Sequence, residues 1–222
     1  MIDVMVQESP LESDSERGPR ARRSGRRSAG RHRTLSVGDA LHVGIRVLRA
    51  LDHARGHGII HRDVKPQNVM LCRREVKVMD FGLARQLEPG HKTTLVAGTP
   101  RYMAPEQFAG KGLDERTDLF GFGVTLFETL AGRLPYPEGV AALGRAAVAP
   151  RLGELRPDVP AELAQVVHRC VALAPAERYP KVNIALAQLE ALRERLEGAV
   201  VPTAAAFPPA AARSGGLRSV GA

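Results

Sequence analysis

Apolar side chains recur every three or four positions between residues 41 and 54. This spacing places them on one face of a helix, so the segment predicts an amphipathic helix packed against a core. Either Ser36 or Asp39 can cap the start of this helix, because their side-chain oxygens accept bonds from the first free N–H groups. Gly56 and Gly58 predict where the helix ends.

A polar loop follows this helix, and short apolar runs flank it. Residues 59–60 and 69–71 are apolar, which predicts a short strand on each side of the loop. Residues 75–79 alternate between polar and apolar side chains, the pattern of a further strand. Residues 83–101 are polar and contain proline and glycine, so we expect a loop there.

The second half of the chain is predicted to be helical. Residues 117–131 are almost wholly apolar, which predicts a helix that is buried on all sides. Amphipathic patterns near residues 161–173 and 181–197 predict two further helices. The expected fold class is therefore mainly α (α+β), with short β-hairpins beside the polar loop.

Composition divides the 222 residues into three parts. Residues 1–33 are rich in Ser, Gly, Pro and Arg, and residues 199–222 are rich in Ala, Pro and Gly. Such segments bury too little apolar surface to offset the entropy lost on ordering, so we predict that both are disordered. A single folded domain is expected over residues 34–198.

The net charge of +8 is distributed unevenly along the chain. Residues 17–33 contain eight arginines and no acid, whereas residues 1–16 contain five acids and no Lys or Arg. The arginines could bind nucleic acid or an anionic membrane surface, or they could form a solvated tail without a partner. We favour the solvated tail, because no aromatic residue interleaves with the arginines for base stacking.

The two cysteines, Cys72 and Cys170, lie far apart and match no metal-binding spacing. Such cysteines fit a reducing compartment, so we expect a cytoplasmic protein. No apolar run approaches the ~18 residues that a membrane span requires. The acidic start of the chain is unlike a secretory signal peptide.

The chain contains five short motifs whose residue types suggest a chemical function. They are HRDVKPQN at 61–68, DFG at 80–82, GTPRYMAPEQ at 98–107, DLFGFGVTLFETLAGRLPY at 118–136 and ERYP at 177–180. Each motif alone is weak evidence for a family. The five together, at this spacing, resemble the eukaryotic-type protein serine/threonine kinases, in the form found in bacteria. The resemblance covers about residues 35–197 and implies the fold of the large, C-terminal lobe of a kinase domain.

The resemblance implies that ATP and Mg²⁺ are the cofactors, and it assigns roles to five residues. Asp63 is the base that accepts the proton of the substrate hydroxyl, and Lys65 neutralises the moving phosphoryl group. Asn68 and Asp80 are the Mg²⁺ ligands, because hard oxygen donors suit this ion. Met70 is placed under the adenine ring, where it can equally be part of a strand core. Lys65 in this loop also indicates Ser/Thr substrates, since tyrosine kinases usually differ here.

Regulation is implied at four further positions. In kinases where an arginine precedes the catalytic aspartate, as Arg62 does, the arginine typically pairs with a phosphorylated activation loop. Thr93 and Thr94 lie within that loop and are the candidate phosphorylation sites, although they can equally be plain polar loop residues. Thr99 resembles the threonine that bonds the catalytic aspartate and lysine.

The remaining matched positions are implied to be structural. They are His61, Phe81, Gly82, Glu106, Asp118 and Arg178. Glu106 and Arg178 resemble a buried ion pair of the family, and Asp118 is expected to bond the backbone near residues 61–62. His61 is expected to pack on Phe81.

Two positions depart from the family pattern. Gly121 stands where the family often has Ser or Ala, and Ala174 precedes a proline where Asp is usual. We expect both departures to affect stability more than chemistry.

The features of a kinase small lobe do not occur in residues 1–57. This segment has no G-x-G-x-x-G loop and no lysine, so the chain resembles the large lobe without the small one. Three interpretations follow: a Ser/Thr kinase whose full-length form is active, a non-catalytic binding module like a pseudokinase, or a split enzyme whose small lobe comes from a partner. The intact Asp63, Lys65, Asn68 and Asp80 argue against an ordinary pseudokinase.

Overall fold

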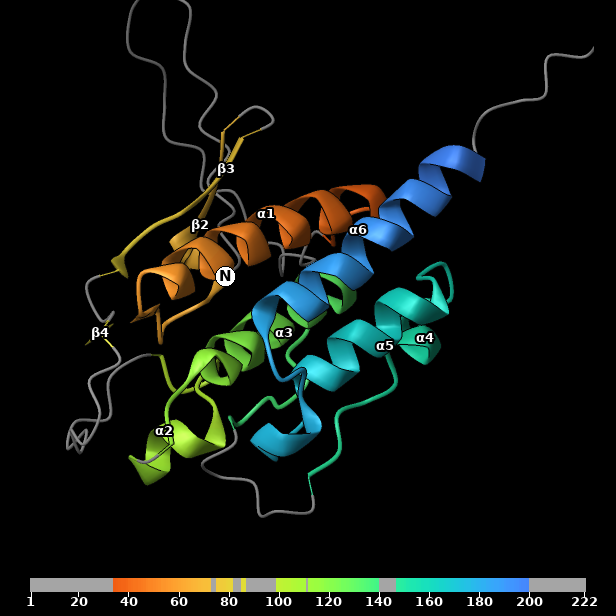
Figure 1. Cartoon of the computed structure of the whole chain (residues 1–222). Coiled ribbons are helices and arrows are strands. Elements are labelled where there is room, and N and C mark those ends of the chain that lie inside the picture. The colour runs from red at the N-terminus through yellow and green to blue at the C-terminus, as the bar shows by residue number, and fades with distance from the viewer. Residues whose placement is uncertain are drawn as a thin grey trace, which may run out of the picture.

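A computed structural model describes residues 34–72, 75–81, 85–86, 99–110, 112–139 and 147–199. Within these residues the fold is mainly helical, and two short antiparallel strand pairs lie at one end (Figure 1). The helices are α1 (Val37–Gly56), α2 (Pro105–Ala109), α3 (Glu115–Ala131), α4 (Leu152–Leu155), α5 (Ala161–Cys170) and α6 (Val182–Ala199). The described residues thus form the expected mainly helical fold with one short hairpin, β2–β3, whereas β1 and β4 are distant in sequence and form no hairpin.

Helix α1 follows directly from the spacing of its apolar residues. The side chain of Ser36 caps the helix by accepting a hydrogen bond from the N–H of Asp39 at 3.1 Å. Its buried stripe includes Leu41, Ile45 and Leu48 and faces α6 and α3. In Figure 1, α1 (orange) and α6 (blue) lie side by side, and α3 (green) crosses beneath them.

Helix α3 forms the centre of the domain, and nearly all of its side chains are buried. Gly123 allows α3 to approach the end of α5 closely. A Cβ atom at Gly123 would lie 2.6 Å from Cβ of Cys170 and 2.9 Å from Cγ1 of Val171. No larger residue fits at this crossing without movement of the helices. The apolar run in the sequence thus becomes the helix around which α1, α5 and α6 pack.

The strands position the polar loop. Strand β1 (Ile59–Ile60) pairs with β4 (Arg85–Gln86), and β2 (Val69–Cys72) pairs with β3 (Glu75–Val78). The β2–β3 register places Met70 opposite Lys77. A 3₁₀ turn at Pro66–Asn68 leads from the loop into β2.

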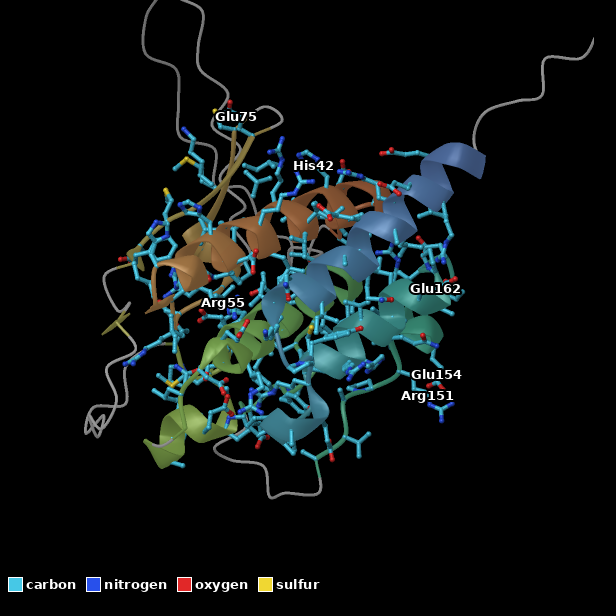
Figure 2. All side chains as sticks on the ribbon, in the orientation of Figure 1. His42, Arg55, Glu75, Arg151, Glu154 and Glu162 are labelled. Atoms are coloured by element: carbon cyan, nitrogen blue, oxygen red, sulfur yellow. The ribbon has the colours of Figure 1, made fainter. Side chains whose placement is uncertain are left out.

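Ion pairs and a hydrogen bond join the helices α1, α3, α5 and α6. Figure 2 shows Arg55 between α1 and α3; its Nε donates to Glu115 at 2.7 Å. The second oxygen of Glu115 accepts the N–H of Val182 at 2.8 Å, which satisfies the first residue of α6. On the outer side, Arg195 of α6 contacts Glu162 of α5 at 3.0 Å. One carboxylate therefore joins α1, α3 and α6.

The structure differs from the sequence prediction in several boundaries. Helix α5 ends at Cys170, where the amphipathic pattern predicted residue 173. The short helices α2 and α4 and the strand β4 were not predicted. The expected disordered segment 1–33 and nearly all of 199–222 lie outside the described residues, as does most of the expected loop at 83–101. No helix among the described residues combines the length and the apolar character that crossing a bilayer needs.

Candidate active site

The polar loop after β1 is anchored by one buried carboxylate of α3. The N–H groups of His61 and Arg62 donate to the two oxygens of Asp118, at 2.9 and 2.7 Å. Asp118 is only 4% exposed, so these bonds are shielded from water. Arg62 has a φ of 68°, in the left-handed region that costs about 1 kcal/mol for a non-glycine residue. Asp118 therefore helps to hold a backbone shape that the chain does not favour by itself.

His61 joins the loop to the segment after β3. Its ring is fully buried, with Nε2 3.0 Å from the carbonyl of Met79 and Nδ1 3.3 Å from the N–H of Asp63. Because a carbonyl only accepts and an N–H only donates, Nε2 carries the proton and Nδ1 is the acceptor. The ring of Phe81 lies against it, with centroids 4.5 Å apart. These contacts join the polar loop to the segment after β3.

The carboxylate of Asp63 is the centre of the site. Its Oδ2 accepts from Nζ of Lys65 at 2.6 Å and from Nδ2 of Asn68 at 3.1 Å. Its Oδ1 accepts from the N–H of Thr99 at 2.9 Å. Lys65 also donates to the hydroxyl of Thr99 at 2.7 Å. Three residues, up to 36 positions away along the chain, thus bond one carboxylate.

This network keeps Asp63 ionised. Burial by itself opposes the charge, but the Lys65 ammonium and the Thr99 N–H outweigh it and hold the pKa of Asp63 below its usual value. A carboxylate at 6% exposure with a fixed orientation can receive a proton from a bound hydroxyl group. Lys65, at 19% exposure of its side chain, places a positive charge beside it.

The predicted cofactor residues lie on the elements around this carboxylate. Asn68 ends the 3₁₀ turn, and its Nδ2 also donates to the carbonyl of Asp63 at 2.8 Å. Its Oδ1 takes part in neither of these two bonds. Asp80 follows β3, is exposed and has a φ of 62°. Met70 is half-buried in β2. Amide and carboxylate oxygens are the donors that Mg²⁺ prefers, so Asn68 and Asp80 fit the ion.

The start of α2 is held by a buried ion pair. Both oxygens of Glu106 accept from the Arg178 guanidinium, at 2.6 and 2.9 Å. Arg178 is 1% exposed, and its guanidinium lies 4.8 Å above the ring of Phe120. Thr117 adds a bond to Glu106 at 3.1 Å. The pair ties the segment that carries Thr99 to the core of the domain.

Three predicted site residues cannot be placed, because Gly82, Thr93 and Thr94 lie outside the described residues. Sequence reasoning also missed one residue of the site. Gln107 donates to the carbonyl of Arg62 at 2.9 Å, although its motif gave no reason to single it out. No signal in the sequence marks this residue, because its partner is a backbone carbonyl 45 positions away.

The pH dependence of stability tests the anchoring role of Asp118. Burial raises the pKa of this carboxyl from 3.8 to about 6, although the N–H groups of Arg62 and His61 oppose the shift. Between pH 3.8 and about 6 the folded protein therefore binds a proton at Asp118 that the unfolded chain does not. The contribution of Asp118 to the free energy of unfolding falls as pH rises through this range.

We expect the stability advantage of the wild type over Asp118→Asn to shrink across that pH window, because asparagine does not titrate. Urea unfolding of both proteins at several pH values measures the difference. An advantage that stays constant or grows with pH would contradict the prediction.

Comparison with known proteins agrees with this geometry. The sequence pattern described as "Protein kinase domain" matches residues 22–187. The chain is 39% identical over 160 residues to the serine/threonine-protein kinase Pkn1 of Myxococcus xanthus, which covers 67% of this chain and 23% of Pkn1. It is 36% identical over 186 residues to pkn3 of the same organism, covering 74% of this chain and 34% of pkn3.

A third relative comes from another bacterium. The serine/threonine-protein kinase PknB of Mycolicibacterium smegmatis is 39% identical over 146 residues, covering 59% of this chain and 22% of PknB. The chain belongs to the protein kinase family, and its relatives are bacterial serine/threonine kinases. It spans about a quarter to a third of the length of these relatives.

Proposed function

We propose that this chain carries the catalytic residues of a protein serine/threonine kinase, which transfers a phosphoryl group from ATP to a Ser or Thr hydroxyl. The observation that supports this best is the fixed carboxylate of Asp63, bonded by Lys65, Asn68 and Thr99. Phosphoryl transfer needs this kind of arrangement, since catalysis depends on positioning and on neutralising charge.

Each residue has a task in this mechanism. Asp63 orients the substrate hydroxyl and accepts its proton as the oxygen forms a bond to phosphorus. Lys65 neutralises negative charge on the transferred group, and its bond to Thr99 keeps the ammonium beside Asp63. Asn68 and Asp80 would hold Mg²⁺. When bound, Mg²⁺·ATP supplies the phosphoryl group and the metal charge that stabilises the departing ADP.

The 222 residues contain no Gly-rich loop and no lysine before Lys65. In kinases these features hold the nucleotide phosphates and must act together with the Mg²⁺ ligands. We therefore propose that this chain by itself transfers phosphate slowly or not at all. A small lobe, joined to it or supplied by a partner, would complete the nucleotide site.

A second candidate function is a binding module without catalysis. Met79 and Phe81 are 37% and 38% exposed, and both lie next to Asp80 at the end of the site. Exposed apolar side chains of this size favour contact with a partner protein. A module of this kind would bind a partner kinase or a substrate through that surface.

Phosphoryl transfer assays separate the two functions. The purified chain is incubated with radiolabelled ATP, Mg²⁺ and a basic protein substrate. A second protein carries the same 222 residues fused behind the small lobe of Pkn1 from Myxococcus xanthus. We expect little or no label from the chain alone, and turnover of ~1–100 s⁻¹ from the fusion.

The outcomes are distinct. Label from the fusion that persists when Asp63 is changed to Asn would overturn the catalytic assignment. A folded fusion without activity favours the binding module. Full turnover by the chain alone would show that the nucleotide site needs no small lobe.

A further inference from the structure

Gln107 is a buried polar residue that has no role among the catalytic residues proposed above. It lies in α2, and only 6% of it is exposed. Its Oε1 accepts the N–H of Ala104 at 2.9 Å, and its Nε2 donates to the carbonyl of Arg62 at 2.9 Å. These two bonds link the start of α2 to the loop that carries Asp63.

The chemistry of the two partners fixes the orientation of the amide. The N–H of Ala104 can only donate and the carbonyl of Arg62 can only accept. A reversed amide would place donor against donor and acceptor against acceptor. Gln107 therefore bridges the two segments in one orientation only.

The bond to Arg62 acts on the peptide group directly before Asp63. The carbonyl of this peptide group is held by Gln107, and its N–H, which belongs to Asp63, is 3.3 Å from Nδ1 of His61. The preceding N–H, of Arg62, is held by Asp118. Arg62 has a φ of 68°, so this peptide group is in an orientation that the free chain disfavours.

We propose that Gln107 is a positioning residue, which holds the Arg62–Asp63 peptide group and so sets the direction of the Asp63 side chain. Its importance for catalysis rests on the proposed kinase function of Asp63. Asp118 bonds the N–H of Arg62, and His61 bonds the N–H of Asp63. Removal of Gln107 therefore removes one of three side-chain bonds to this stretch of backbone.

Gln107 is itself attached to a rigid support. Its neighbour Glu106 is bonded to the buried Arg178, and Thr99 on the same segment bonds Asp63 directly. The segment from Thr99 to Gln107 therefore makes two contacts near the proposed base, one with the Asp63 carboxylate and one with the carbonyl of the preceding residue, Arg62. A displacement of α2 would act on the Arg62–Asp63 peptide group through Gln107.

Amide hydrogen exchange of the 222-residue chain tests this proposal, with Gln107→Leu and Gln107→Glu as the variants. Leucine removes both bonds. Glutamate keeps the acceptor for Ala104, but when ionised it presents an oxygen to the Arg62 carbonyl. Gln165→Glu on α5 is the matched control, because it makes the same chemical change away from the loop.

We expect the protection factor of the Asp63 amide to fall about tenfold or more in both variants at neutral pH, the loss typical of a buried hydrogen bond. Amides in the middle of α3 should keep their protection. In Gln107→Glu the protection should recover as pH falls, because the protonated carboxyl can donate to the Arg62 carbonyl again. Gln107→Leu should show no recovery.

A second readout uses the fusion described above. There, both substitutions should lower kcat and leave the KM for ATP unchanged, since Gln107 acts through Asp63 and not on the nucleotide. An inactive fusion would refute the kinase function. The positioning role would still be tested, because hydrogen exchange at Asp63 does not depend on phosphoryl transfer.

Three results would overturn the proposal. The first is wild-type protection at Asp63 in both variants. The second is an equal loss of protection throughout α3, which would mean general destabilisation. The third is an unchanged kcat in an active fusion despite lost protection at Asp63.

Discussion

Changing Asp63 to Asn in the fused, active form lowers the rate of phosphoryl transfer by about 10²–10⁴-fold, the usual contribution of a general base. Asparagine has nearly the same shape and can still accept the Thr99 N–H. It cannot take up the hydroxyl proton, and its NH₂ group would face the donors of Lys65 and Asn68, which now bond Oδ2. The loss is therefore expected in kcat, with little change in the KM for ATP.

Initial rates with radiolabelled ATP measure this effect. Asp52→Asn makes the same chemical change on α1, away from the loop, and should leave the rate within about twofold of wild type. Circular dichroism and thermal unfolding of both variants show whether the fold is kept. A folded Asp63→Asn protein with wild-type kcat would remove Asp63 from the mechanism.

Changing Arg178 to Met lowers the free energy of unfolding by about 3–5 kcal/mol, because one-sided removal of a buried ion pair leaves a charge without compensation. The side chain of Glu106 is 9% exposed and would lose both of its bonds to the guanidinium. The carbonyls of Arg116, Ala172 and Leu173 would lose a donor as well. Methionine fills a similar volume, so the loss reflects polar contacts more than an empty cavity.

Urea unfolding measures this prediction. Arg195→Met is the control, because the Arg195–Glu162 pair is exposed at 60% and 55% of the two side chains. Exposed pairs contribute ~0–1 kcal/mol, so the control should remain close to wild type. The double substitution Arg178→Met with Glu106→Leu should recover part of the loss, because no buried charge remains unpaired. Equal stability of Arg178→Met and the control would refute the role of the pair.

The exposed apolar side chains lie at the same end of the site as a proposed Mg²⁺ ligand. Met79 and Phe81 flank Asp80, and the ring of Phe81 already contacts His61 behind the catalytic loop. A partner that covers these two side chains would lie directly beside Asp80, a proposed Mg²⁺ ligand. Nucleotide binding and partner binding are therefore expected to influence each other at this position.

Much of the fold follows from the order of residues alone. The helical spacing of apolar residues predicted α1, with Ser36 as one of two candidate caps, and the apolar run from 117 to 131 predicted α3. These signals are local, since three or four residues along a helix already decide which face is apolar. The catalytic set was assigned by the similarity of motifs to a family and not by the physics of the chain, although the convergence of Asp63 and Lys65 is visible in the structure.

The contacts between distant segments were decided by the tertiary structure. Arg85–Gln86 became a strand only because β1 offers it a pairing edge, and nothing in those two residues predicts it. Helix α2 is too short to show any periodicity, so the task of Gln107 could not be read from the sequence. Its partner, the Arg62 carbonyl, lies 45 positions away and belongs to the backbone, which carries no sequence signal.

The sequence by itself therefore predicted the four long helices α1, α3, α5 and α6, and it showed which family the motifs resemble. Tertiary contacts with α2 and α3 determined how the polar loop is held, because the left-handed Arg62 needs partners from two separate helices. A backbone conformation that is unfavourable by itself persists only where surrounding elements fix it. That information exists only once the chain is folded.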